Sequence, residues 1–291
     1  MAKPLVVITG KTGQLGWEIE QLSQQYSQQF HFLFTSRAEL DLSNPASIAP
    51  FFETYTPAYF INCAAYTAVD KAEQEQTLAY TINAESVGLI AQYCAEINAV
   101  LITISTDYVF DGNGTSPYLT TTATKPINYY GYSKWMGEQL ALSNCKKSIV
   151  IRTSWVYSTH GNNFVKTMLR LMNDRPSLNV VSDQIGSPTS AADLAAAIIS
   201  IIQSIEKGNA HYGIYQYSNS GVISWYDFAV AIAKEANKKT IVSPIPSTDF
   251  PTPAKRPAYS VMDITGIETD YQITILPWLE SLQICIAELA R

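Results

Sequence analysis

The sequence has 291 residues, of which 47% are hydrophobic and 15% are charged. These proportions predict one large domain or two lobes around a sizeable core, and they exclude a disordered chain. The formal net charge of −6 argues against a nucleic-acid or membrane-surface binder, because such proteins carry a basic field. The sequence shows neither a signal peptide nor a run approaching the roughly 20 apolar residues of a membrane span, so we expect a cytoplasmic protein.

Strands and helices alternate in the first part of the chain. Short apolar runs rich in β-branched residues predict strands at 3–9, 31–35, 59–62, 100–104 and 148–151. Apolar residues at helical spacing predict helices over 13–25, 44–55, 68–97, 129–143 and 163–172, and the second of these would begin at Asn44 and Pro45. This alternation predicts an α/β fold in which crossover helices cover both faces of a doubly wound, Rossmann-like parallel sheet.

After Asp183 the alternation loosens. Helices are predicted over 191–205, over 224–236, where Ser224 and Asp227 form a capping-box pattern, and from Pro277 to 290. Five prolines between residues 244 and 257 predict an extended loop. We therefore divide the chain into a Rossmann domain, residues 1–182, and residues 183–291, mostly a smaller substrate-binding lobe with some chain returning to the main domain.

Three glycines follow the first predicted strand and open the first helix. Gly10, Gly13 and Gly16 allow a tight turn and a close approach to a pyrophosphate, which binds at the positive end of the helix. A nucleotide-triphosphatase loop would need Gly-Lys-Thr at its end, whereas Lys11 and Thr12 stand here at the beginning. The arrangement therefore predicts a dinucleotide site.

The second strand ends at Ser36 and Arg37, where NAD-binding proteins carry an acidic residue. A hydroxyl and a forked cation at this point predict recognition of a 2′-phosphate, so that residues 1–182 would bind NADPH. Glu39 follows closely, which leaves the use of NADH open.

Tyr130 and Lys134 lie four residues apart and therefore share one face of a predicted helix. A free phenol has a pKa of ~10, and a neighbouring ammonium group is expected to lower it toward the range of general acid catalysis. Thr106 ends the fourth strand and could hydrogen-bond the same carbonyl oxygen as the phenol. A tyrosine and a lysine at this spacing are common in sequences. The pair supports a catalytic role only because it occurs together with Thr106 and the glycine loop.

These motifs resemble those of the extended short-chain dehydrogenase/reductase superfamily and, within it, the dTDP-4-dehydrorhamnose reductase family. The further blocks that carry the resemblance are 62–73, 105–110, 152–157, 161–164, 183–189 and 251–257. They run in order through nearly the whole chain, which is hard to obtain by chance.

The resemblance implies a reductase that transfers a hydride from NADPH to the 4-keto group of dTDP-4-dehydro-L-rhamnose, giving dTDP-L-rhamnose. It makes Tyr130 the proton donor, Lys134 its tuning partner and a ligand of the nicotinamide ribose, and Thr106 the group that orients the carbonyl. Further implied cofactor contacts are Gly13, Gln14, Leu15, Asp41, Leu42, Ala65, Tyr66 and Thr67. Implied substrate contacts are Thr106, Asp107 and Trp155, and Arg256 is a candidate for the diphosphate.

Some members of the family bridge a dimer through Mg²⁺, with carboxylates after the 183–189 block. Ser190, Ala191 and Ala192 stand there in this chain, so we expect no metal, while a homodimer stays open. The alternatives are another nucleotide-sugar reductase, an epimerase or dehydratase, and a non-catalytic subunit on the same fold. A dehydratase would carry a second acid where Tyr108 follows Asp107, and a non-catalytic subunit tends to lose the tyrosine or the lysine.

Overall fold

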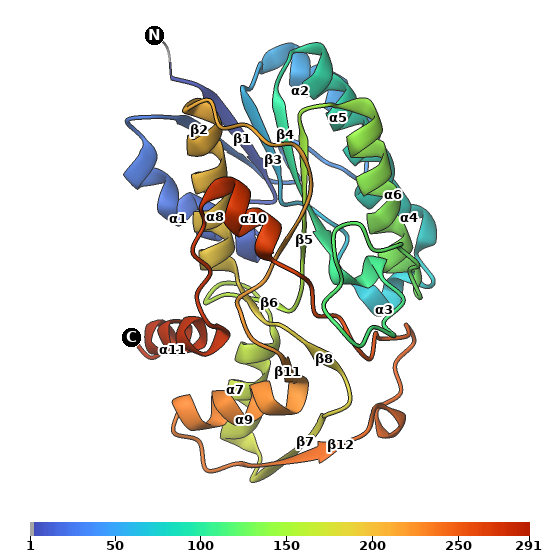
Figure 1. Ribbon diagram of the computed structural model, residues 1–291, viewed down its shortest axis with the longest axis vertical. Helices are drawn as coiled ribbons and strands as arrows, with labels where there is room; N and C mark the ends of the chain where they lie inside the picture. Colours follow the sequence, from blue (N-terminus) through green and yellow to red (C-terminus); the bar gives the residue numbers. More distant parts are fainter. Residues whose placement is uncertain (1–2) are drawn as a thin grey trace.

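The computed structural model describes residues 3–291. At its centre lies a six-stranded sheet in which every pair of neighbouring strands is parallel (Figure 1). From one edge to the other the strands are β2 (His31–Thr35), β1 (Leu5–Thr9), β3 (Tyr59–Asn62), β4 (Val100–Thr106), β5 (Ser148–Thr153) and β10 (Gly213–Tyr217). The predicted strands and the doubly wound α/β class are thus confirmed.

Helices cover both faces of this sheet because its strands are apolar on both sides. Successive side chains of a strand point to opposite faces, so Val6 and Ile8 enter one core cluster and Val7 enters the other. The helices α1 (Gln14–Ser23), α8 (Ala191–Glu206) and α10 (Thr265–Tyr271) pack on the first face. The second face is covered by α2 (Ile48–Thr54), α5 (Ser86–Glu96) and α6 (Tyr129–Asn144).

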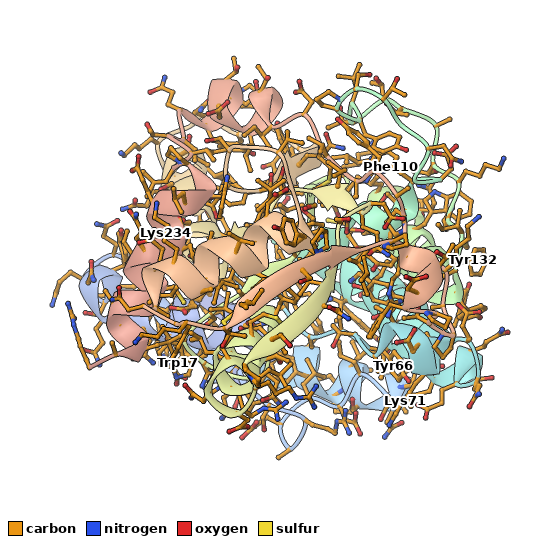
Figure 2. The ribbon with its side chains drawn as sticks, turned by 90° about the horizontal axis from the view of Figure 1, so that it is seen from below. Trp17, Tyr66, Lys71, Phe110, Tyr132 and Lys234 are labelled. Atoms are coloured by element: carbon orange, nitrogen blue, oxygen red, sulfur yellow. The ribbon has the colours of Figure 1, made fainter. Side chains whose placement is uncertain are left out.

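A smaller lobe, drawn below the sheet in Figure 1, has an apolar core of its own. It contains α7 (Phe164–Asp174), α9 (Trp225–Glu235) and α11 (Trp278–Leu289), together with β7 (Ser177–Val181) paired to β12 (Ile241–Ile245). Met168, Phe228 and Leu282 bring the three helices together. Figure 2, seen from below, shows the β7–β12 pair crossing in front of the rest of the molecule.

The smaller lobe includes a strand that precedes residue 182, and the main sheet includes a strand that follows it. β7 precedes this position and pairs with β12, while β10 follows it and joins the main sheet beside β5. The division of the chain at residue 182 stays a prediction. Within residues 3–291, none of the helices has the length and apolar character needed to cross a membrane.

Two expected elements differ in the structure. The helix predicted to begin at Asn44 starts as a short 3₁₀ segment, Pro45–Ser47, and α2 begins only at Ile48. Asn44 makes no side-chain capping bond, because the turn is organised by Asp41, whose carboxylate accepts from Ser43 and whose carbonyl accepts from Ser47. The proline-rich stretch begins with β12, which tolerates Pro244 because it pairs with β7 alone.

The long helix expected over 68–97 is also divided. It consists of α3 (Val69–Ala72), α4 (Gln76–Tyr80), a π-helical turn (Thr81–Glu85) and α5. The π-helical turn lets Asn83 reach Ser133 on α6 with its amide, and Gly137 of α6 lies so close that a Cβ atom there would collide with the Asn83 carbonyl oxygen. The capping box of Ser224 and Asp227 is present as predicted.

Candidate active site

A cleft of about 710 Å³ opens where the strands of the main sheet end. It is lined by the glycine loop after β1, by the residues after β2, β3 and β5, and by Thr106 at the end of β4. The carboxyl ends of parallel strands are where open α/β sheets bind ligands. Sequence positions far apart in the chain therefore meet here.

The glycine loop turns tightly enough to aim the start of α1 at the cleft. Gly10 adopts a φ of 72°, in the left-handed region, and a Cβ atom there would lie 2.9 Å from the Ala64 nitrogen. A Cβ atom on Gly16 would collide with the Gly10 carbonyl oxygen, so Gly16 allows α1 to pack on the loop and does not itself line the cleft. The loop brings Gly10, Gly13, Gln14 and Leu15 into the cleft wall.

The far end of the cleft contains the residues after β2. Ser36, Arg37, Asp41 and Leu42 all line it, as predicted from the sequence. The Arg37 side chain is 79% exposed and lies 3.9 Å from the Asp41 carboxylate. Hydrogen bonds from Ser43 to Asp41 lower the pKa of that carboxyl group.

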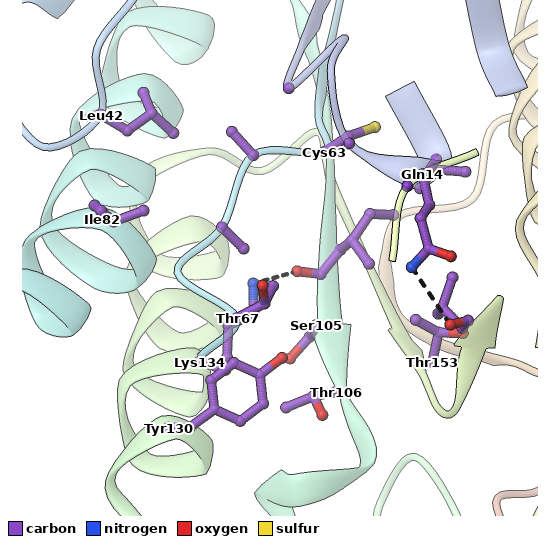
Figure 3. A pocket seen from close by; sticks show the side chains of 18 of the residues that line it. Gln14, Leu42, Cys63, Thr67, Ile82, Ser105, Thr106, Tyr130, Lys134 and Thr153 are labelled. Carbon is purple, nitrogen blue, oxygen red and sulfur yellow. Dashed lines mark hydrogen bonds between the residues drawn. The ribbon is translucent and has the colours of Figure 1, made fainter. Parts of the chain in front are cut away.

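Tyr130 and Lys134 enter the cleft from α6, as the i, i+4 spacing predicts (Figure 3). Asn128 caps this helix by accepting a hydrogen bond from the Gly131 nitrogen at 2.8 Å. The Lys134 ammonium is buried and donates to the Ile104 carbonyl oxygen at 2.6 Å, near the end of β4. Burial lowers the pKa of Lys134 to about 8, and the nearby Glu138 carboxylate opposes this fall.

The environment of Tyr130 contradicts the expected lowering of its pKa. Burial raises the pKa of Tyr130 to about 12, which the Thr106 hydroxyl offsets in part and the Asp107 carboxylate increases further. The physical reason is that burial leaves the charged phenolate poorly solvated. Tyr130 therefore holds its proton through the neutral range, which suits a proton donor.

Asp107 and Trp155 line the same cleft as Tyr130 and Thr106. The Asp107 side chain is 2% exposed, and one of its oxygens accepts from the Thr106 hydroxyl at 3.0 Å. Its other oxygen, Oδ2, has no hydrogen-bond partner among residues 3–291. Burial raises the pKa of Asp107 to about 6.

Trp155 forms part of the wall on the side of the smaller lobe. Its φ of 49° lies in the left-handed region, which is rare for a bulky residue and marks a position where the surroundings enforce strain. The Trp155 ring stacks on Trp225 of α9 with 3.6 Å between ring centroids. The smaller lobe thus fixes one wall of a cleft whose other walls belong to the main sheet.

Two further residues predicted for the site lie outside the cleft lining. The Tyr66 hydroxyl donates to the Glu75 carboxylate at 2.7 Å. Arg256 donates through Nη2 to Asp70 at 2.8 Å, and its guanidinium lies 6.0 Å from the centre of the Tyr108 ring. Tyr108 itself lines the cleft, so Arg256 lies behind one of its walls.

Several lining residues were not predicted as site residues from the sequence. They are Thr12, Leu40, Ser43, Cys63, Ala64, Val69, Ile82, Ile104, Ser105, Tyr108, Thr153, Ser154, Val156, Gly161, Asn162 and Leu194. The segments 152–157 and 161–164 already carry the family resemblance, and this signal could have indicated Thr153, Ser154 and Gly161. Leu194, on α8, has no local signal because only packing brings it to the cleft.

A buried ion pair joins α6, the helix that carries Tyr130 and Lys134, to β5. Arg152 on β5 donates through Nε and Nη2 to the two oxygens of Glu138 on α6, at 2.9 and 2.7 Å. Ser105 on β4 donates to the same carboxylate at 2.5 Å. Since both charged side chains are at most 2% exposed, the pair joins α6 firmly to the two strands at the cleft.

This fold and this cleft define the class of the protein, which is an extended short-chain dehydrogenase/reductase. Residues 4–291 match the model of the family described as RmlD substrate binding domain. The chain belongs to this family, that of the dTDP-4-dehydrorhamnose reductases.

Relatives and solved structures agree over nearly the full length. The chain is 40% identical to the dTDP-4-dehydrorhamnose reductase of Aggregatibacter actinomycetemcomitans, covering 96% of this chain and 97% of that protein. It is 39% identical to the enzyme of the same name from Escherichia coli K12, covering 98% and 97%. A crystal structure of dTDP-4-dehydrorhamnose reductase from Bacillus anthracis in complex with NADP superposes with a TM-score of 0.93, at 38% identity, covering 99% of this chain and 100% of that one.

Proposed function

We propose that this protein transfers a hydride from NADPH to the 4-keto group of dTDP-4-dehydro-L-rhamnose, forming dTDP-L-rhamnose. The names of its relatives and the NADP of the Bacillus anthracis structure support this substrate and this cofactor. Within this chain, the observation that best supports the proposal is the position of Tyr130. Its phenol shares one cleft with Thr106, Lys134 and the glycine loop.

The residues of the cleft fit the proposed cofactor. The start of α1 behind Gly13, Gln14 and Leu15 offers backbone N–H groups and a positive helix end to the pyrophosphate. Ser36 and Arg37 would face the 2′-phosphate, with Asp41 and Leu42 beside the adenine. Ala65 and Thr67 would line the path toward the nicotinamide, whose ribose Lys134 would hold. When bound, the cofactor supplies the hydride.

The proton comes from the protein in this proposal. Addition of a hydride to the carbonyl carbon leaves negative charge on the oxygen, and an alkoxide is more basic than a phenolate whose acid has a pKa of about 12. The proton therefore moves from the Tyr130 hydroxyl to the sugar oxygen. Thr106 orients this oxygen once its hydroxyl turns from Asp107 to donate a hydrogen bond to it. The Lys134 ammonium stabilises the phenolate that remains.

Asp107 and Trp155 would contact the sugar. The unpartnered Oδ2 atom of Asp107 can accept a hydrogen bond from a sugar hydroxyl, which would satisfy a buried acceptor. The Trp155 ring, held by Trp225, offers an apolar wall. Arg256 stays a candidate for the diphosphate, because its buried Nη1 atom has no hydrogen-bond partner among residues 3–291. The absence of a metal and the homodimer stay predictions.

The test mixes the purified protein with NADPH and dTDP-4-dehydro-L-rhamnose and follows the absorbance of the reduced nicotinamide. The proposal requires one NADPH consumed for each sugar reduced. An altered sugar with unchanged cofactor would indicate an epimerase, and no change in either would indicate a binding subunit. Both outcomes would refute the reductase.

A further inference from the structure

Glu39 fills an anion-binding position beside Ser36, which lines the far end of the cleft. Its Oε2 atom accepts hydrogen bonds from the Ser36 backbone nitrogen at 2.6 Å and from the Ser36 hydroxyl at 2.5 Å. Its Oε1 atom lies 3.5 Å from the Lys11 ammonium. One carboxylate thus occupies three donors, two of them from Ser36 and one from the glycine loop.

These donors lie where a dinucleotide presents the 2′ substituent of its adenosine ribose. In Rossmann folds that substituent lies at the end of the second strand, and Ser36 and Arg37, the first residues after β2, line the cleft. Lys11 is held at the same place, because its backbone nitrogen donates to the Thr35 carbonyl oxygen at 3.2 Å. A backbone N–H, a hydroxyl and two cations together form a site for a phosphate.

We propose that Glu39 determines cofactor specificity by acting as an internal anion that occupies the 2′-phosphate site. NADPH must displace the carboxylate from Ser36 and Lys11, whereas NADH leaves it in place to accept a hydrogen bond from the ribose 2′-hydroxyl. The inference rests on the proposed use of a nicotinamide cofactor and names a determinant of its choice.

The local structure allows this exchange. The Glu39 side chain is 48% exposed, so the carboxylate can rotate into solvent without leaving a buried charge behind. Arg37 lines the cleft and its side chain is largely exposed, so the guanidinium is free to turn toward an incoming phosphate. The hydrogen bonds from Ser36 lower the pKa of Glu39 to about 2, so the internal anion is charged throughout the neutral range.

The test measures binding rather than turnover, so that it does not depend on the sugar substrate. Adenosine 2′,5′-bisphosphate and 5′-AMP are titrated by calorimetry into the wild-type protein and into the variants Glu39→Gln and Lys11→Met. Glutamine keeps the size of the side chain and removes its charge. We expect Glu39→Gln to bind the bisphosphate about tenfold more tightly while 5′-AMP changes less than about twofold, because only the 2′-phosphate meets the carboxylate.

Lys11→Met should weaken the binding of the bisphosphate about tenfold. A dianionic phosphate loses more attraction to the missing ammonium than the carboxylate that it replaces. Glu53→Gln, which removes the same charge from an exposed position on α2, serves as the matched control and should leave both affinities unchanged. Equal changes for both ligands in Glu39→Gln, or no change in either, overturn the inference. If the protein binds both nucleotides but reduces no sugar, the proposed function fails and the specificity result still stands.

Discussion

The Lys134 ammonium donates to the backbone carbonyl of Ile104 at 2.6 Å. This bond joins the face of α6 that carries Tyr130 to the last residues of β4, two positions before Thr106. The bond explains why the phenol and the threonine hydroxyl share one cleft although they lie on different elements. The carbonyl takes one of the three N–H donors of the ammonium group, and the group keeps its charge.

Removal of the Tyr130 hydroxyl tests the proton donor. We expect Tyr130→Phe to lower kcat by roughly 10²- to 10⁴-fold, the contribution typical of a positioned general acid. The affinity for NADPH, measured by nicotinamide fluorescence, should change less than about twofold, since the ring stays in place. Tyr132→Phe, two residues further along α6 and exposed, is the control. Near-full activity of Tyr130→Phe would show that another group supplies the proton.

The pH dependence should reflect Lys134. Its pKa of about 8 means that the ammonium is charged below this pH and neutral above it. Because the charged form stabilises the Tyr130 phenolate, we expect kcat/KM to fall as pH rises through about 8. Tyr130 itself, with a pKa of about 12, stays protonated over the same range. A steady-state profile from pH 6 to 10 that stays flat would contradict the role of the charge.

The charged Asp107 carboxylate should lower the free energy of unfolding at neutral pH. Its folded pKa of about 6 lies above the ordinary pKa of 3.8 for an aspartate. The folded state therefore binds the extra proton between these pH values, and stability falls as pH rises through this window. Asp107→Asn should therefore raise the free energy of unfolding by about 1–3 kcal/mol at pH 7, and by less at pH 4. The measurement is urea denaturation at both pH values.

Asp111→Asn serves as the control of opposite sign. Hydrogen bonds from the Asn113 backbone and from Tyr118 lower the pKa of Asp111, so loss of this carboxylate should destabilise the fold at neutral pH. If Asp107→Asn is also less stable at pH 7, the buried carboxylate contributes net stability and the expectation is wrong.

Removing one charge of the Glu138–Arg152 pair should lower the free energy of unfolding more than removing both charges. Glu138→Gln leaves the buried guanidinium without its counter-charge, and such losses typically cost about 3–5 kcal/mol. The double variant Glu138→Leu with Arg152→Met removes both charges and should recover much of that loss. The measurement is chemical denaturation of the wild type, the single variant and the double variant. Equal stability of the single variant and the wild type would exclude a structural role for the pair.

Much of the site could be predicted from the sequence because it depends on local spacing. The glycine loop follows from Gly10, Gly13 and Gly16 between a strand and a helix, and the shared face of Tyr130 and Lys134 follows from helical geometry alone. The alternation of apolar strands and helices is likewise enough to predict a parallel sheet with both faces covered. Each of these features involves residues that are neighbours along the chain.

The remaining features depend on residues that are distant in sequence and that burial brings together. The pKa of Tyr130 rises because the folded protein excludes water from it, and Lys134 donates to Ile104, 30 residues away. Lys11 reaches Glu39, Arg256 pairs with Asp70 behind Tyr108, and β10 enters the main sheet beside β5. Periodicity assigns a residue to a face, but which group it meets there is decided by packing and by the need of buried polar atoms for partners.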